Sequence, residues 1–285
     1  MRKLSLDEIK KLQLDMLSVF DAFCTEHGLS YQLAYGTLIG AVRHKGYIPW
    51  DDDIDLTMPI EDYRRMCDIV NSRHANGMID ERYRLADMYV ESTVAYHQSF
   101  AKIYDTKTTA TVSGLRPDAG FQEAVFVDIF PIVGMPDDNV RRDELTAKLA
   151  KVNSMLYWST RDVKPGDFNP IHPRTAYRAL RNWLASRKKP FGAWLSEYAR
   201  ILSQFPDARG AQAAYDIKAT FMDGDPFILD CNPWEPCIPM EFEGRTYPGP
   251  ARYDYILTRF YGSYMQLPPE DQRIPSHNQD FFIED

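Results

Sequence analysis

Four carboxylates lie within five positions of the chain, and a cluster of this kind can bind metal ions: Asp51, Asp52, Asp53 and Asp55. Side chains alternate along a strand, so Asp53 and Asp55 are expected to point to one face and to bring their oxygens to one or two hard cations. Two such cations can stabilise both the entering and the leaving oxygen of a displacement at phosphorus. The alternative is a solvated acidic turn. We favour the metal site because Ile54 and Leu56 indicate a buried strand, where unpaired charge is costly.

A fifth aspartate, Asp128, interrupts an apolar run at residues 125–130. An aspartate among such residues is rarely buried unless it is paired or bound to a metal. We therefore assign Asp128 as a further metal ligand, one that also takes the proton from an attacking hydroxyl. The alternative is a carboxylate that closes the strand near Pro131.

Gly36 and Thr37 stand where a flexible turn is expected to meet the start of a helix. Backbone N–H groups at such a place and the Thr37 hydroxyl can bind phosphate oxygens. Taken alone, the pattern is more typical of a capped helix with a tight turn. The strand with Asp53 and Asp55 that follows it favours phosphate binding.

Basic residues near the carboxylates are candidates for contacts to the phosphates. Arg43, His44 and Lys102 could neutralise charge that develops on a phosphate in the transition state. Arg43 is the strongest of them because a guanidinium binds phosphate through two parallel hydrogen bonds. Lys45 is more typical of a solvated surface. Trp50, which precedes the carboxylates, is a further candidate for a contact to the donor.

The elements that must position these residues follow from hydrophobic periodicity. A helix should begin after Ser5 and end at Gly28, because its apolar residues fall on one stripe. Strands are expected at residues 31–34, 54–58, 100–104, 108–112 and 125–130. Further helices are expected through residues 41–44 and at 61–71, 139–158, 174–187, 191–205, 211–220 and 253–261. Together they predict an α/β (α+β) fold in which helices flank a mixed sheet.

Composition changes along the chain divide it into three parts. Residues 1–135 are predicted to form the catalytic core, residues 136–225 a mainly helical region, and residues 226–285 a C-terminal α/β segment that packs back on the core.

The charge balance limits the classes of partner. The chain has 33 basic and 41 acidic residues and a net charge of −8. This balance argues against nucleic acid as the main partner, and an acidic protein that handles phosphates needs metal ions to offset repulsion. No run approaches the roughly 18 apolar residues that a membrane span needs, and no apolar signal core follows the first basic residues. We expect a cytoplasmic protein, either free or peripheral at the inner face of the membrane.

The cysteines are scattered rather than paired: Cys24, Cys67, Cys231 and Cys237. The spacing fits no zinc site. Buried, reduced thiols are the expected state.

The run at residues 35–55, YGTLIGAVRHKGYIPWDDDID, resembles the signature of the LicD family of phosphotransferases. Residues 127–131 resemble the second block of that family, and residues 261–269 resemble its C-terminal block. One departure is that Ser263 follows Gly262 where the family commonly has aspartate. The resemblance spans about residues 6 to 277, and the helical middle is the least similar part.

The resemblance implies a nucleotidyltransferase-like core with a helical insertion or extension. Members of the family transfer phosphocholine from CDP-choline to cell-surface glycans such as lipopolysaccharide or teichoic acid, and eukaryotic relatives transfer ribitol phosphate from its CDP form. For this chain it implies a CDP-linked donor, a glycan acceptor that is either free or lipid-linked, and CMP as the leaving group. Asp53, Asp55 and Asp128 would hold Mg²⁺ or Mn²⁺, with Asp51 and Asp52 as direct or water-mediated ligands.

Choline is the alcohol that we favour, because a quaternary ammonium is held by aromatic faces. The chain has 17 tyrosines and 5 tryptophans, among them Trp50, Tyr247, Tyr253 and Tyr255. Ribitol phosphate and glycerol phosphate remain alternatives. Two further alternatives are a nucleotidyltransferase that releases pyrophosphate and a non-catalytic binding protein on the same fold.

Overall fold

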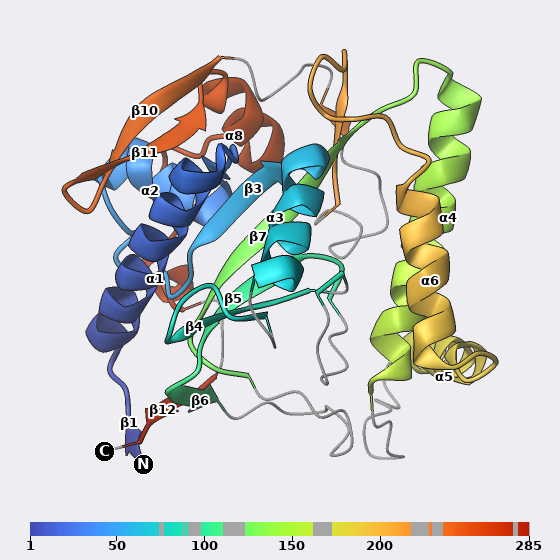
Figure 1. The fold of residues 1–285 in the computed structure, drawn as a ribbon, viewed down its shortest axis with the longest axis horizontal. Helices are drawn as coiled ribbons and strands as arrows, with labels where there is room; N and C mark the ends of the chain where they lie inside the picture. The colour runs from blue at the N-terminus through green and yellow to red at the C-terminus, as the bar shows by residue number, and fades with distance from the viewer. Residues whose placement is uncertain are drawn as a thin grey trace.

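A mixed sheet of seven strands forms the centre of the computed structural model (Figure 1). The strand order is β2-β3-β7-β5-β4, and β8 and β9 extend the sheet from β7. Its strands are β2 (Gln32–Leu33), β3 (Asp55–Pro59), β4 (Tyr83–Ala86), β5 (Ala101–Asp105), β7 (Phe126–Gly134), β8 (Ala214–Asp216) and β9 (Ile228–Leu229). The structure describes residues 1–73, 77–87, 89–90, 98–110, 123–161, 173–217, 228–229, 236–275 and 279–284. The α/β class expected from the sequence is confirmed.

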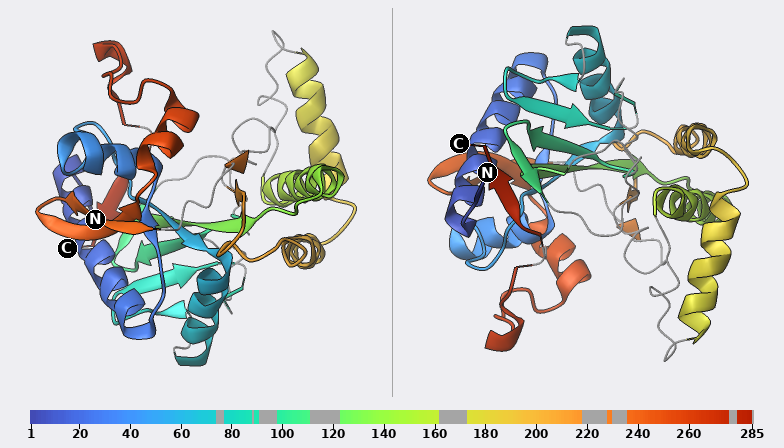
Figure 2. Two further views of the ribbon diagram at one scale, coloured as in Figure 1. Left: turned by 90° about the horizontal axis from the view of Figure 1, so that it is seen from above. Right: turned by 90° about the horizontal axis from the view of Figure 1, so that it is seen from below.

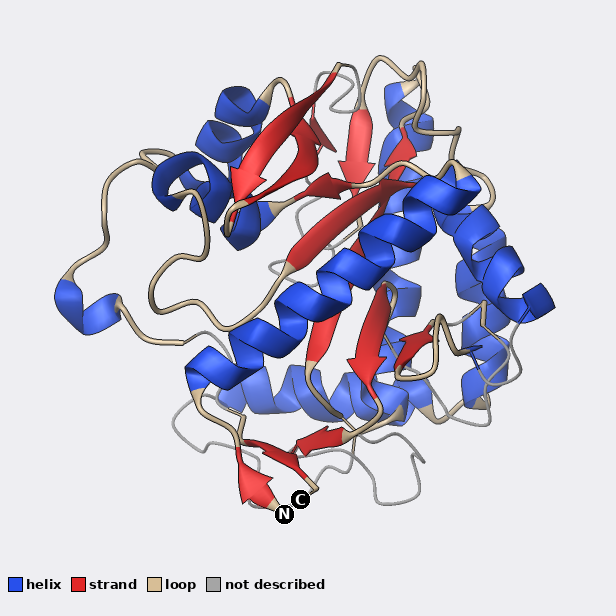
Figure 3. Ribbon diagram, turned by 60° about the vertical axis from the view of Figure 1, so that its left-hand side comes forward, coloured by secondary structure: helices blue, strands red, loops and turns tan. Residues whose placement is uncertain are grey.

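The central strands β3 and β7 are parallel and buried along their whole length. The other pairings in this sheet are antiparallel. Helices α1 (Leu6–His27) and α3 (Ile60–Arg73) pack on one face of the sheet, and Figure 3 shows α1 crossing the strands diagonally. Because side chains alternate, Leu56 and Met58, neither of which is exposed, face the opposite way from Asp55.

Helix α1 has the boundaries that its sequence predicts. The Ser5 side chain accepts a hydrogen bond from the Glu8 N–H, and the Glu8 carboxylate accepts one from the Ser5 N–H in return. Gly28 ends the helix with a left-handed φ of 59°, a conformation that glycine adopts without a steric penalty. Each end of the helix is therefore fixed locally.

Helix α2 (Tyr35–His44) begins earlier than the sequence analysis expected. Gly36 and Thr37 lie inside its first turn, so the expected flexible turn before a short helix is wrong. Tyr35 itself has a positive φ of 44°. A bulky residue rarely holds this conformation unless its surroundings impose it.

A group of three helices stands to one side of the sheet (Figures 1 and 2). They are α4 (Asn139–Ser159), α5 (Pro173–Ser186) and α6 (Phe191–Leu202). The helix expected at residues 211–220 is wrong in its described part. Residues 214–216 form strand β8, because they pair with β7 and are buried there. Pairing with a sheet has overridden the helix propensity of the alanines.

The C-terminal segment packs back on the core. A small second sheet of β1 (Arg2–Lys3), β12 (Phe281–Ile283) and β6 (Thr108–Ala110) joins the two ends of the chain. The hairpin of β10 (Cys237–Phe242) and β11 (Arg245–Pro250) contacts α2 and β2. At its turn the Glu243 carboxylate accepts a hydrogen bond from the Tyr47 N–H at 3.0 Å.

Helix α8 (Tyr253–Tyr261) lies on the side of the sheet opposite α1 and α3 (Figure 2), and a short 3₁₀ turn, η4 (Glu270–Gln272), follows it.

The domain boundaries stay predictions, although β8 shows that the helical region returns to the central sheet.

The thiols differ in environment. Cys24 and Cys67 are buried and free, as expected, and burial raises the pKa of both. Cys237 is free but exposed on the hairpin, so the expectation of burial is wrong there. Cys231 lies outside the described residues. Among the described residues, no helix has the length and apolar character needed to cross a membrane.

Candidate active site

A row of charged side chains crosses three neighbouring strands of the central sheet. The register pairs Asp55 of β3 with Asp128 of β7, and it pairs Asp128 with Lys102 of β5. Side chains of paired residues on adjacent strands point to the same face. Each of the three residues exposes 5% of its surface or less. The fold thus brings together two carboxylates assigned to metal binding and one cation assigned to phosphate.

Lys102 offsets the charge of one of these carboxylates. Its Nζ lies 3.0 Å from Asp128 Oδ1, and it also lies 3.2 Å from the centroid of the Phe126 ring. Asp55 adds a second negative charge one strand away, which is about 4.8 Å. Two buried carboxylates with one ammonium leave a negative balance that a metal cation can offset. A direct contact from Lys102 to a phosphate stays a prediction.

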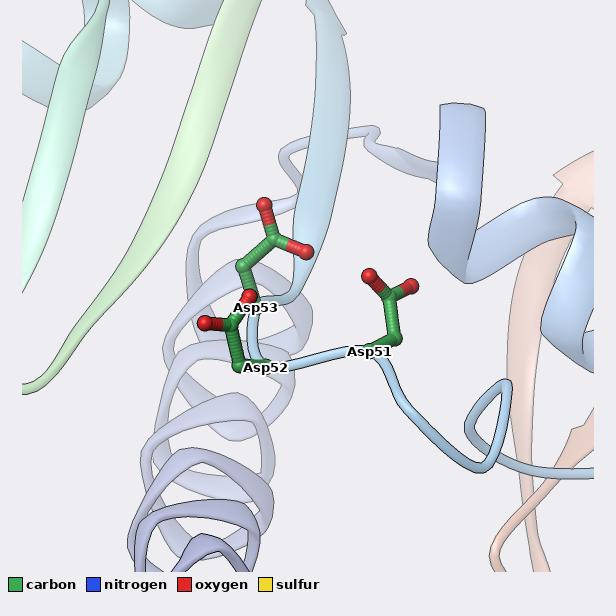
Figure 4. Close-up of side chains that lie close together, drawn as sticks. All are labelled: Asp51, Asp52 and Asp53. Carbon is green, nitrogen blue, oxygen red and sulfur yellow. The ribbon is translucent and has the colours of Figure 1, made fainter. Parts of the chain in front are cut away.

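The loop that leads into β3 supplies three more carboxylates (Figure 4). Asp51, Asp52 and Asp53 each offer one oxygen, and these oxygens lie within 4.8 Å of one another. Asp52 and Asp53 expose 6% and 8% of their surfaces. Asp51 is partly buried. Burial, together with the charges of Asp55 and Asp52, raises the pKa of Asp51 to about 6. Clustered carboxylate oxygens of this kind are the ligand type that Mg²⁺ and Mn²⁺ prefer.

The first turn of α2 lies directly against these carboxylates. A Cβ on Gly36 would lie 2.8 Å from Asp51 Oδ2, so the absence of a side chain lets the helix approach the loop. The Thr37 hydroxyl accepts a hydrogen bond from the Asp55 N–H at 2.9 Å. The helix N-terminus also favours negative charge nearby. Both residues therefore position the carboxylates, and their contact to phosphate stays a prediction.

Arg43 and His44, at the other end of α2, face the C-terminal segment. Arg43 Nη1 donates to the carbonyl oxygen of Tyr264 at 2.7 Å, and Arg43 Nε donates to His44 Nε2 at 2.9 Å. Burial, and then the charge of Arg43, lowers the pKa of His44. These bonds link α2 to the segment after α8. A contact of either side chain with a phosphate would need N–H groups that do not take part in these bonds. That contact stays a prediction.

The aromatic residues assigned to the donor lie in different settings. Trp50 is partly buried, and the guanidinium of Arg273 lies 5.6 Å from the centroid of its ring. Tyr247 is a core residue that exposes 2% of its surface, so its candidacy as a ligand for choline is wrong. Tyr255 has the guanidinium of Arg252 5.3 Å from its ring centroid. None of these contacts points to a bound headgroup.

Two residues of α1 hold the carboxylate loop, and sequence reasoning missed both. Gln13 Nε2 donates to the carbonyl oxygen of Asp52 at 2.9 Å and to that of Phe126 at 3.3 Å, which ties the loop to β7. Lys10 Nζ donates to the carbonyl oxygen of Pro49 at 3.0 Å. Burial lowers the pKa of Lys10, and Asp51 is the leading charge that opposes this shift. Both were missed because the prediction of α1 used only its apolar stripe.

A second group missed from the sequence surrounds Tyr35. Its hydroxyl donates to Asp216 of β8, and its ring packs edge-on against Phe130 and Phe260, each at 5.4 Å. Tyr261 reaches the same region from α8. Burial, and then the charges of Asp55 and Asp216, raises the pKa of the Tyr261 hydroxyl, although 47% of the residue is exposed. Asp216 was missed because its segment was expected to be helical.

Comparison with known proteins identifies the family of the chain. Residues 28–168 match the family model described as LicD/FKTN/FKRP, nucleotidyltransferase domain. The lipopolysaccharide cholinephosphotransferase LicD of Haemophilus influenzae is 32% identical over 295 residues, which cover 99% of this chain and 100% of the relative.

A shorter similarity links the chain to a eukaryotic enzyme. The ribitol 5-phosphate transferase FKRP of Homo sapiens is 42% identical over 55 residues, which are 19% of this chain and 11% of that protein. The match to the bacterial relative extends over nearly the whole chain, and the carboxylates lie in the segment that the family model covers. The chain therefore belongs to the LicD family.

Proposed function

We propose that the protein is a metal-dependent phosphotransferase. It moves a phospho-alcohol group, with phosphocholine as the favoured group, from a CDP-linked donor to a hydroxyl of a cell-surface glycan, and CMP is released. The observation that carries this proposal is the cluster of Asp51, Asp52 and Asp53 in the loop that leads into β3, where the first strand residue, Asp55, pairs with Asp128. Burial of so many carboxylates is costly without cations.

The donor set fits a hard divalent cation. Asp53, Asp55 and Asp128 would hold Mg²⁺ or Mn²⁺, and Asp51 and Asp52 would ligate it directly or through water. When bound, the cation would neutralise charge on the diphosphate and on the departing CMP. Gln13 and Thr37 keep the ligands in place through their hydrogen bonds to the loop and to Asp55.

Asp128 is the residue that we propose as proton acceptor for the attacking glycan hydroxyl. It is buried, and Lys102 lies 3.0 Å from its Oδ1. An ammonium at this distance holds the carboxylate in one orientation, which is what a positioned base requires.

Phosphocholine is the group that the full-length relative supports best, because the name of that protein is cholinephosphotransferase. Burial and charges that include those of Asp55, Asp51 and Asp53 raise the pKa of the Tyr261 hydroxyl, so this exposed aromatic residue is a candidate for the headgroup, since an aromatic face can hold a quaternary ammonium. A specific observation also favours ribitol phosphate as a second candidate, namely the 55-residue similarity to the ribitol 5-phosphate transferase. We propose that the reaction takes place on the cytoplasmic side of the cell.

The experiment that tests this proposal is a comparison of donors. The protein is incubated with Mg²⁺, a glycan that offers acceptor hydroxyls and, in separate reactions, CDP-choline, CDP-ribitol, CDP-glycerol or a nucleoside triphosphate, and the products are separated. Release of CMP from CDP-choline supports the proposal. Release of pyrophosphate from a nucleoside triphosphate, with no CMP from any CDP-alcohol, would instead identify a nucleotidyltransferase.

Competition then separates the two alcohols. If free CDP-ribitol displaces bound CDP-choline at an equal or lower concentration, the choline assignment is wrong, although the phosphotransferase assignment stands.

A further inference from the structure

Helix α5 carries large apolar side chains on its outer surface. Tyr177, Leu180 and Leu184 expose 66%, 40% and 54% of their surfaces. Their spacing of three and then four residues places them on one stripe of the helix. Scattered exposed leucines need no explanation, whereas a continuous stripe marks a contact surface.

The other side of α5 is packed against the protein. The indole N–H of Trp183 donates to the carbonyl oxygen of Arg161 at 3.4 Å, and Ser186 is fully buried. Helix α5 contacts α4 and projects from the end of the α4 and α6 pair, away from the sheet (Figure 2). The apolar stripe is thus held in a fixed orientation at the margin of the molecule.

Basic residues are concentrated in the segment that carries this stripe. Residues 173–189 contain six basic residues and no acidic residue: Arg174, Arg178, Arg181, Arg187, Lys188 and Lys189. The whole chain has a net charge of −8, so this segment opposes the sign of the rest. Arg178 and Arg181 are exposed next to the stripe. Lys189 is already paired with Glu197 of α6.

The turn between α5 and α6 adds a hollow of about 310 Å³. Arg187, Lys188 and Lys189 line it, together with the hydroxyl-bearing residues Ser159 and Ser186. A hollow with this lining suits a small anionic group such as a phosphodiester. It lies at the C-terminal end of the apolar stripe.

We propose that α5 and the turn after it dock the protein on an anionic lipid bilayer. A helix with an apolar stripe and cationic flanks lies in the interface between water and lipid, with the stripe among the acyl chains and the cations at the headgroups. Charge complementarity selects this partner over a second copy of the chain. A twofold interface would bring the same cations face to face.

This inference is independent of the proposed reaction, since lipid binding is measured without donor or acceptor. The probe is a set of vesicles made of phosphatidylcholine alone or of phosphatidylcholine mixed with phosphatidylglycerol. The full chain should sediment with the mixed vesicles at low salt and should be released as the salt concentration rises.

Two paired variants test the two components of the surface. Arg178→Gln with Arg181→Gln should weaken binding about 30-fold, the effect of two cations at about 1 kcal/mol each. Leu180→Gln with Leu184→Gln should weaken it at least about tenfold, because these side chains would no longer enter the apolar layer. The matched control is Lys11→Gln with Lys107→Gln, which removes the same charge from exposed positions on α1 and beside β6. The control should bind as the wild type does.

Three results would overturn the proposal. One is equal binding of the wild type to neutral and anionic vesicles, and another is an arginine variant that binds no more weakly than the control. The third comes from sedimentation equilibrium. A wild type that ignores vesicles but forms a dimer, which the leucine variant dissociates, would assign the stripe to a second copy of the chain.

Discussion

The central sheet and the helical group treat charge in opposite ways. On the sheet, Asp55, Asp128 and Lys102 are buried in one row, and the chain has to compensate their charge inside the fold. On α5 the charged residues are exposed, and large apolar side chains are exposed to water beside them.

This difference determines how much of each region's role can be predicted from the sequence. Buried charge is expensive, so the position of an aspartate within an apolar run is enough to indicate a bound cation or a chemical role. Exposed basic and apolar residues cost little free energy, so their order in the sequence does not by itself indicate a role. Residues 174–187 are typical of an ordinary amphipathic helix, and only their exposure in the fold marks a contact surface.

The largest expected effect comes from the loop and strand carboxylates. Asp53→Asn or Asp55→Asn should lower turnover at least about 100-fold, or about 2.7 kcal/mol on the barrier, because each removes a charged ligand. The fold should remain, as judged by circular dichroism. The control is Asp137→Asn, an exposed carboxylate before α4 that should keep full activity. Retention of more than about a tenth of wild-type turnover in either variant would refute the metal assignment.

Asp128→Asn should separate catalysis from binding. If Asp128 takes the proton of the acceptor, kcat should fall about 100-fold while the donor KM changes much less. Steady-state kinetics with varied donor measure both values. A variant with an unchanged kcat and a raised donor KM would mean that the proton acceptor lies elsewhere.

Two glycine substitutions compare packing in the two regions. A Cβ on Gly40 of α2 would lie 2.4 Å from the carbonyl oxygen of Gly46, so Gly40→Ala should lower the free energy of unfolding by about 1 to 3 kcal/mol. Gly192 of α6 has no atom within 4 Å of the same position. Gly192→Ala should therefore leave stability unchanged or raise it by up to about 1 kcal/mol. Urea denaturation measures both, and equal effects would contradict the close contact at α2.

An effect on stability of similar size is expected at Tyr35. Tyr35→Phe removes a hydrogen bond to the buried Asp216 and should cost about 1 to 3 kcal/mol of stability. It should also slow CMP release about tenfold, because Tyr35 precedes Gly36 and a small shift there moves the carboxylate loop. Tyr31→Phe is the matched control, since that hydroxyl donates to Asp21 at 2.7 Å on α1. It should lose stability and keep its rate, and an equal loss of rate in the two variants would assign Tyr35 a structural role alone.

Much of the core could be predicted because its signals are local. Ser5 and Gly28 define α1 through caps that involve only neighbouring residues. The apolar runs around Asp55 and Asp128 predicted two strands, whereas their parallel pairing was not predicted. Asp53 lies in the loop before β3, so the alternation expected for Asp53 and Asp55 along one strand does not apply, and the oxygens that lie close together are those of Asp51, Asp52 and Asp53.

The parts that could not be predicted depend on distant partners. Asp216 reaches the site only because β8 pairs with β7, a contact across more than 80 positions of sequence. Arg43 meets the Tyr264 carbonyl across 221 positions, and Gln13 meets that of Phe126 across 113. Nothing in the local pattern of these residues specifies such partners. Propensity favoured a helix at residues 211–220, and tertiary pairing decided against it.

The most direct test of the central claim is the binding of Mn²⁺, measured by electron paramagnetic resonance on the metal-free protein. The claim is that the carboxylates at the start of β3 hold a divalent cation that the transfer needs. The wild type should bind Mn²⁺ and lose CMP release in EDTA, and Mg²⁺ should restore that release. Asp53→Asn and Asp55→Asn should bind Mn²⁺ at least about tenfold more weakly than Asp137→Asn. Equal Mn²⁺ affinity in all three variants, or CMP release that persists in EDTA, would contradict the account.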